Sequence, residues 1–282
     1  MYTLSDLIQG AIKYMGIDAF DTRIATGGST TTLVDTNLTD KYGDDEIIDG
    51  TVVVTRDAAG ANASPEGQFS RISLYVESTN TATVDTALTD GIATGDTCMI
   101  VSPEYPLRII KEIVNDALRD VGKIGVTYTP TVDATYTNVY TIPYPFEDIK
   151  SVYVSYVSND ELISKYISFT RYWQHDNTGL AINTSDSCLL ELHDTPESTE
   201  TVYVMCEAYH PKVNAYSDAI DSSIPVPMIT LLVADKLMQW HGVTDANANY
   251  ANKIQAELAE AKRIAMPKKF SHGTRFLTWG DS

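Results

Sequence analysis

The sequence is poor in cysteine and has no long apolar run, and its start does not resemble the leader of a secreted protein. Its three cysteines, Cys98, Cys188 and Cys206, lie far apart and include no CxxC pair. An odd, scattered set argues against a disulfide framework and favours a reduced protein of cytoplasmic origin. No run approaches the roughly 20 apolar residues that span a bilayer. The N-terminus lacks the basic and apolar regions of a signal peptide, so we expect no signal peptide. The absence of a long apolar run predicts no membrane segment.

Positive charge is also scarce, because 20 Lys and Arg stand against 38 Asp and Glu, a net charge of -18. This balance excludes nucleic-acid binding through an overall basic surface. Residues 262–282 are the exception: five Lys or Arg and one Asp give them a charge of +4, so the rest of the chain carries -22. The asymmetry indicates an acidic partner or an acidic surface for this segment. A solvated terminus is the alternative.

Motifs of known catalytic and metal sites are absent: there is no P-loop, GxGxxG, GxSxG, HExxH or zinc spacing. The pairs beginning at His175 and His193, each followed by Asp, could form half of a hydrolase site, although strand ends explain them more simply. The acidic run at 44–49 lacks the spacing of a calcium loop, which favours a solvated turn. We therefore expect no enzyme, no metal and no cofactor.

Helical periodicity marks two stretches in the first half of the chain. Residues 3–15 begin with Thr3 and Asp6, a capping-box pattern. Residues 104–123 have Pro106 near the start and apolar residues recurring every three or four positions. Both stretches need a partner surface for their apolar faces.

A helical hairpin over residues 225–265 is the expected partner. Its first helix begins at Pro227 and is apolar on most sides, whereas the second is amphipathic and stops before Pro267. We expect the helices together to form one discontinuous bundle. Its predicted core residues are Leu7, Ile110, Val114, Val233, Leu237, Trp240, Ile254 and Leu258.

Two β-rich regions separate the helices. The first, 26–102, contains an internal repeat, with VDTNLTD at 34–40 and VDTALTD at 84–90. The second, 126–212, is rich in β-branched and aromatic residues. The sequence therefore predicts an α+β fold with two inserted antiparallel β modules, each a small barrel or sandwich. The predicted divisions are a bundle of 1–25, 103–125 and 224–266, modules at 26–102 and 126–212, and a C-terminal arm at 267–282.

Tyrosines are frequent in the second β region and allow a different function. A carbohydrate-stacking surface would use such rings, but tyrosine is also simply a good strand residue, and we favour that interpretation. The tyrosines in question are Tyr136, Tyr140, Tyr144, Tyr153 and Tyr156.

The order of elements resembles a head-to-tail connector, or adaptor, from the neck of a tailed bacteriophage. The helices MYTLSDLIQGAIKYMG, PLRIIKEIVNDALRDVGKIG and PMITLLVADKLMQW with YANKIQAELAEAKRIA resemble the adaptor bundle. The strand pair VYTIPYPFEDIKSVYVSY resembles the β region of the tail-tube-adaptor type. STTTLVDTNLTD and GTVVVTR resemble a β module of phage structural proteins, although the 26–102 insert is larger than a minimal adaptor needs.

The resemblance implies a virion protein of the neck, synthesised in the host cytoplasm, that forms a homo-oligomeric ring, usually of twelve copies. The ring joins the portal protein above to a tail, nozzle or tail-terminator protein below, and genomic DNA passes through it. A channel lined by carboxylates would let DNA slide without sticking. A β-rich receptor- or glycan-binding baseplate or fibre protein is the alternative, and a hydrolase is the third. By analogy, the contacts that dock the arm on the portal are Lys268, Lys269, Phe270, Arg275, Phe276 and Trp279.

Overall fold

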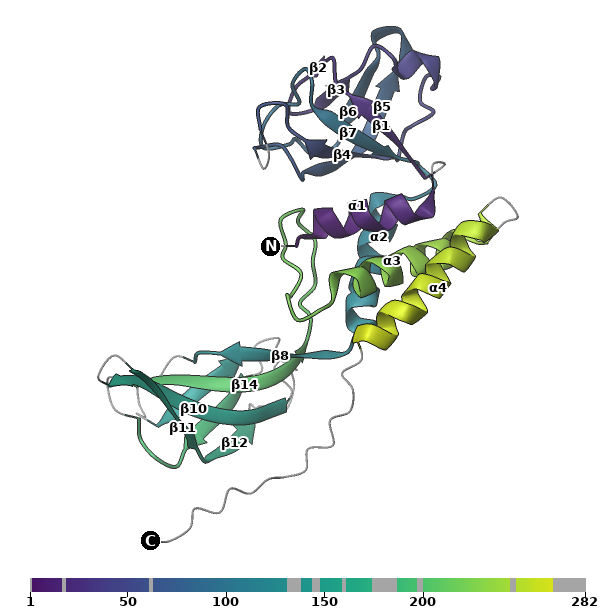
Figure 1. Ribbon diagram of the computed structural model, residues 1–282. Helices are drawn as coiled ribbons and strands as arrows, with labels where there is room; N and C mark the ends of the chain where they lie inside the picture. Colours follow the sequence, from purple (N-terminus) through teal and green to yellow (C-terminus); the bar gives the residue numbers. More distant parts are fainter. Residues whose placement is uncertain are drawn as a thin grey trace, which may run out of the picture. The chain divides into compact units, whose positions relative to one another are not determined.

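The protein is an α+β protein, with four helices and three antiparallel sheets in the part of the chain that the structure describes (Figure 1). The chain divides into two compact units, Met1–Ala117 with Val213–Ser282, and Leu118–Lys212. None of the described helices combines the length and the apolarity needed to cross a membrane. The computed structural model describes residues 2–16, 19–60, 63–130, 138–143, 148–158, 161–173, 187–196, 200–243 and 247–265.

Helix α1, Leu4–Met15, forms where the sequence predicts it. Its capping box is complete: the Asp6 backbone N–H donates to the Thr3 hydroxyl over 3.3 Å, and the Thr3 N–H donates to the Asp6 carboxylate over 2.9 Å. The helix ends at Gly16, whose φ of 101° favours glycine. A Cβ there would lie 2.9 Å from the ring of Tyr250. The end of α1 is therefore in close contact with the fourth helix.

The C-terminal hairpin consists of α3, Val226–His241, and α4, Ala248–Ala265, and both pack against α1 (Figure 1). Gly10 of α1 permits the close approach to α3, since a Cβ there would lie 2.9 Å from the Thr230 Cγ2. The hairpin prediction is confirmed. The hairpin supplies the partner surface for the apolar face of α1.

One predicted core residue is wrong. Trp240 is 47% exposed, whereas Leu7, Ile110, Val114, Val233, Leu237, Ile254 and Leu258 are at most 5% exposed. In the last turn of α3 it is His241, one residue further on, that packs inward, with its ring stacked on Tyr105 at 4.9 Å. Trp240 is rotated by about 100° from that direction and so faces outward.

Helix α2, Leu107–Asp120, is shorter than the predicted 104–123. The segment before α3 packs against it. The Asn115 side chain accepts from the Val213 N–H and donates to the Val213 carbonyl, both over 2.9 Å. The same segment caps α1, since the Leu4 N–H donates to the Asp218 carbonyl over 2.9 Å. The connection before α3 is therefore a structural brace between helices.

The first β region forms a seven-stranded sheet in the order β1-β7-β4-β5-β6-β3-β2, and its first strand lies at residues 20–24, which the sequence predicts as part of the helical bundle. The two outer strands of this order, β1 and β2, are separated only by Ala25 and Thr26 along the chain. A single apolar core that includes Val52, Ile72 and Ile100 lies within the sheet. The strands are Phe20–Ile24 (β1), Gly27–Gly28 (β2), Thr32–Val34 (β3), Thr51–Arg56 (β4), Phe69–Val76 (β5), Thr81–Val84 (β6) and Thr97–Val101 (β7).

The internal repeat has a packing role in this sheet. Each copy begins at the end of β3 or β6, and these two strands pair antiparallel. Each copy then turns and places a leucine, Leu38 or Leu88, in the same apolar core. Because the strands run in opposite directions, the two leucines enter from opposite ends of the strand pair.

The two chain segments that connect this sheet to the helices lie side by side and form its neck. Phe20 of β1 pairs with Val101 of β7, and the Ser102 N–H donates to the Ala19 carbonyl over 2.9 Å. A second contact joins the sheet to α2, where the Lys111 ammonium lies 5.1 Å from the centre of the Phe69 ring. The neck determines which residues of the sheet adjoin the helices.

The unit Leu118–Lys212 has two antiparallel sheets around a separate core. One has the order β11-β10-β14-β8 and the other β12-β13-β9. Core residues such as Val154, Val204 and Leu190 come from both sheets. The strands are Lys123–Tyr128 (β8), Val139–Pro143 (β9), Asp148–Ser158 (β10), Glu161–Ile167 (β11), Phe169–Trp173 (β12), Ser187–Leu192 (β13) and Thr201–Tyr209 (β14).

Candidate functional site: a hollow at the neck and exposed aromatic surfaces

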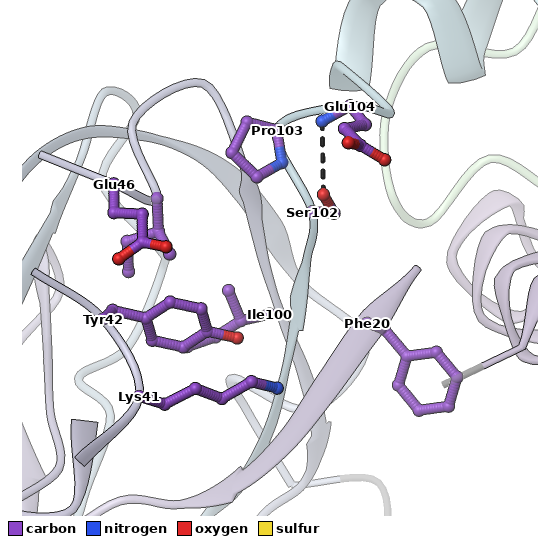
Figure 2. A pocket seen from close by; sticks show the side chains of 9 residues that line it. Phe20, Lys41, Tyr42, Glu46, Ile100, Ser102, Pro103 and Glu104 are labelled. Carbon is purple, nitrogen blue, oxygen red and sulfur yellow. Dashed lines mark hydrogen bonds between the residues drawn. The ribbon is translucent and has the colours of Figure 1, made fainter. Parts of the chain in front are cut away.

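A hollow of about 400 Å³ lies at the neck of the seven-stranded sheet (Figure 2). One wall comes from the neck itself, at the start of β1 and the end of β7, and the other from the turns that follow the first repeat. The volume is at the lower end of the range for ligand pockets, about 300–1,000 Å³. The lining residues are Phe20, Lys41, Tyr42, Glu46, Ile47, Ile100, Ser102, Pro103 and Glu104.

Lys41 and Tyr42 lie alongside each other at the hollow, with the ammonium and the hydroxyl at the same end (Figure 2). Both bind Asp21: the ammonium is 3.3 Å from the Asp21 carboxylate, and the Tyr42 hydroxyl donates to it over 3.2 Å. Burial, together with the Asp21 charge, raises the pKa of Tyr42. Burial opposes the charge on Lys41, but Tyr42 and Asp21 outweigh it, so the pKa of Lys41 is raised. Lys41 therefore keeps its charge and shares it with Asp21.

Two carboxylates contribute the remaining charge of the hollow. Glu46 accepts from the Gly43 N–H over 2.8 Å, which fixes its position in the lining. Glu104 lies 3.1 Å from His241 Nε2, at the end of α3. Since Asp21 offsets Lys41, the lining and its ion-pair partner together carry about two negative charges when His241 is neutral. Phe20 and Pro103 supply apolar surface to the lining, whereas Ile100 is almost fully buried.

The acidic run at 44–49 forms hydrogen-bonded turns. The Asp44 carboxylate accepts from the Glu77 N–H over 2.7 Å, and Asp49 binds Arg71. Asp45 and Asp49 have positive φ angles of 61° and 71°, which suit tight turns. Across the described ranges, no three His, Cys, Asp or Glu side chains are grouped so as to hold a metal ion.

Of the two histidines considered for hydrolysis, only His193 is described by the structure. His175 lies outside the described residues, whereas His193 Nε2 is 2.7 Å from the Thr170 hydroxyl on the exposed surface of the second unit. The adjacent Asp194 pairs with Lys165 at 3.7 Å. A hydrolase would also need a third group that orients the histidine and donors for an oxyanion, and Asp194 is engaged elsewhere.

The tyrosines of the second unit fall into two groups. Tyr140 is 2% exposed and belongs to the core. Tyr153 stacks on Tyr203, with ring centres 5.1 Å apart, and meets the edge of Tyr166 at 6.2 Å. These three occupy paired positions across β11, β10 and β14. Tyr156 is in β10, and Tyr136 and Tyr144 lie outside the described residues.

Only part of this row of three tyrosines can stack on a sugar. A sugar stacks on an open ring face, but the stack with Tyr203 covers one face of Tyr153. Tyr166 remains 74% exposed. Of the three rings, Tyr166 is thus the one most available to a ligand.

The arm residues predicted to dock on the portal, Lys268, Lys269, Phe270, Arg275, Phe276 and Trp279, lie outside the described residues. The helix before them is described. Only Ala251, Ile254 and Leu258 of α4 are buried, and Ile264 in its last turn is 72% exposed. Near the turn of the hairpin, Trp240 and Val243 are also exposed. Periodicity missed this exposure because it does not show where the partner helix ends.

Comparisons with other proteins leave these features to be interpreted on physical grounds. No protein-family model matches the chain, and no curated protein or solved structure matches it either.

Proposed function

We propose that the protein is a structural subunit of a tailed-bacteriophage neck, a head-to-tail adaptor that forms a homo-oligomeric ring beneath the portal. In this proposal α1–α4 form a discontinuous bundle at the centre of each subunit. The seven-stranded sheet is a small barrel, because the outer strands β1 and β2 of its order are two residues apart in the chain. The two sheets of the second unit form a sandwich around their common core.

The observation that carries the proposal is the end of α4. Ile264 is 72% exposed there, immediately before a segment that combines basic and aromatic residues in an acidic chain. Aromatic and arginine side chains dominate the binding energy of interfaces. A segment that orders on binding can also cover a large partner surface. We therefore assign the arm at 267–282 to the portal, with an acidic docking surface as its complement.

The negative charge of the rest of the chain fits a ring through which DNA passes. Residues outside 262–282 carry a net charge of -22. Twelve such subunits would surround the channel with carboxylates, which repel phosphate groups and keep DNA from adhering. The ring would join capsid to tail as an assembly protein without catalytic activity.

Removal of the arm tests the proposal. A chain ending at Met266 should no longer bind rings of the cognate portal protein, in co-sedimentation and in negative-stain images, while its circular dichroism stays unchanged. The triple variant Lys268→Glu, Lys269→Glu and Arg275→Glu should weaken binding in the same assay. Lys253→Glu is the matched control, because Lys253 is an exposed lysine of α4 outside the arm. Portal binding that survives loss of the arm would refute the docking role.

A receptor- or glycan-binding virion protein is the second candidate, and the exposure of Tyr166 favours it. A glycan ligand would contact the exposed ring of Tyr166. Glycan-array binding that Tyr166→Ala abolishes and Tyr140→Phe leaves intact would support this function over the neck. Absence of binding to any glycan would leave the adaptor as the better explanation.

A further inference from the structure

The hollow at the neck has the chemistry of a receptor for a basic, aromatic peptide. Phe20 and Pro103 contribute apolar surface to its lining, and the carboxylates Glu46 and Glu104 belong to the same lining. An aromatic side chain that enters such a hollow buries about 150–250 Å². A neighbouring lysine or arginine can then pair with a carboxylate, and such charge-assisted bonds are about twice as strong as neutral ones.

The chain itself contains a peptide of this kind. Residues 267–282 include three aromatic residues and three Lys or Arg against one Asp. In the sequence, Phe276 and Trp279 are within four residues of Arg275, so one short stretch offers both an anchor and a cation. In contrast, the seven-stranded sheet and its neck, residues 20–102, contain 13 Asp or Glu and only four Lys or Arg. The arm and this β region are therefore complementary in charge.

The direction of α4 favours the hollow of another copy over that of the same chain. The start of α4 lies near the hollow, since Tyr250 packs on Gly16, and the end of α3 reaches Glu104 through His241. α4 has 18 residues, so its other end lies about 27 Å further along the helix axis. In sequence, the arm follows Ala265 at that far end of α4. It would have to double back over the whole helix to reach its own hollow.

We propose that the hollow receives the C-terminal arm of a second copy of this chain. The contact is heterologous, since an arm on one copy meets a hollow on the next, and repeated contacts of this type close into a ring when the rotation permits. The inference concerns the protein without its portal and does not depend on the neck function. A portal that binds the arm would compete with the hollow for the same segment.

Disulfide trapping between full-length chains tests the proposal. One chain carries Ser102→Cys in the hollow and the other carries Thr278→Cys beside Trp279, both with Cys188→Ser, because Cys98 and Cys206 are buried. A disulfide forms only when the two Cα atoms approach within about 7 Å. Mixing the two chains under mild oxidation, without portal, should give a mixed dimer on a non-reducing gel.

Matched variants decide what a mixed dimer means. Asp90→Cys is the position control, because Asp90 is an exposed residue of the loop between β6 and β7 that does not line the hollow. Glu46→Lys with Glu104→Lys in the Ser102→Cys chain should lower the yield by about tenfold, the effect of about 1.4 kcal/mol of lost attraction. Equal trapping at Asp90 and Ser102, or no mixed dimer, would overturn the proposal. A chain carrying both cysteines that forms only an intrachain bond would overturn it as well.

Discussion

At the scale of single residues, two partly or fully buried polar side chains bond backbone groups that have no other backbone partner. Asn115 satisfies both the N–H and the carbonyl of Val213. Asp96 is fully buried and accepts from the N–H groups of Ala58 and Ala93 over 2.9 and 2.8 Å. Removing one of these side chains costs more free energy than the hydrogen bond itself contributes, because its partner is left buried without a bond. No sequence pattern marks them, since their partners lie far along the chain.

Replacing Asn115 should therefore destabilise the protein. We expect Asn115→Ala to lower the free energy of unfolding by about 1–3 kcal/mol, because both backbone groups of Val213 lose their partner. Asn214, the exposed residue after Val213, is the control: Asn214→Ala should change the free energy of unfolding by less than about 0.5 kcal/mol. Urea unfolding followed by circular dichroism measures both. Equal effects of the two substitutions would contradict the bracing role of Asn115.

A second prediction at this scale concerns pH. Burial, with the charges of Asp96 and Asp35 adding to it, raises the pKa of the Cys98 thiol to about 12. The unfolded thiol ionises near its ordinary pKa of about 8.5, so the unfolded chain releases a proton first as the pH rises. The stabilising contribution of Cys98 is complete below pH 8.5 and declines steadily up to pH 12.

The variant Cys98→Ala isolates this effect from the other groups that titrate at high pH. The difference in unfolding free energy between the native chain and the variant should be largest at pH 7 and should shrink at pH 9 and 10.5. Urea titrations at the three pH values give the difference directly. A difference that stays constant with pH would show that the thiol is not protected by burial.

At the scale of elements, the helices follow from local sequence while their outward faces do not. The capping box of α1 and the proline near the start of α3 are local signals; α1 begins right after its capping residue, and α3 begins one residue before Pro227. In α3 the apolar residues cover nearly the whole circumference, so periodicity alone does not distinguish Trp240 from Leu237. The packing of α1 and α4 against α3 makes that distinction.

Leu237 and Trp240 should thus differ sharply in their contribution to stability. Leu237 is fully buried, and Leu237→Ala should cost about 2–5 kcal/mol through the cavity it leaves. Trp240→Gln should cost less than about 1 kcal/mol, because almost half of the side chain is already in water. Thermal unfolding of the two variants provides the comparison. A larger loss for Trp240→Gln would place this tryptophan back in the core.

At the scale of the whole molecule, two compact units are joined where the chain crosses between them at two points. In the second unit, β8 and β14 pair from Lys123↔Tyr209 onward, so its first and last strands are adjacent. In the other unit, Asn115 binds Val213, which joins the chain segments that lead into and out of the second unit. Each unit has buried apolar residues of its own, so each meets the main requirement for independent folding.

The second unit should fold alone. A fragment of residues 118–212 should unfold cooperatively on heating and give a dispersed amide NMR spectrum, because its core draws on both of its own sheets. The complementary chain, in which a short Gly-Ser linker replaces these residues, should retain the helical circular dichroism of the first unit. A fragment without cooperative unfolding would show that the unit needs the rest of the chain.

The sequence by itself determined the α+β class, the four helices with their order, the two β regions and the arm's unusual charge. These features depend on residues close in the chain, through caps, apolar periodicity and composition. Only the tertiary structure decided that Trp240 faces outward, that the repeat supplies Leu38 and Leu88 to one core, and that Lys41, Glu46 and Glu104 meet at a hollow. Glu104 is 58 residues from Glu46, and their meeting depends on strand pairing at the neck, which local sequence does not encode.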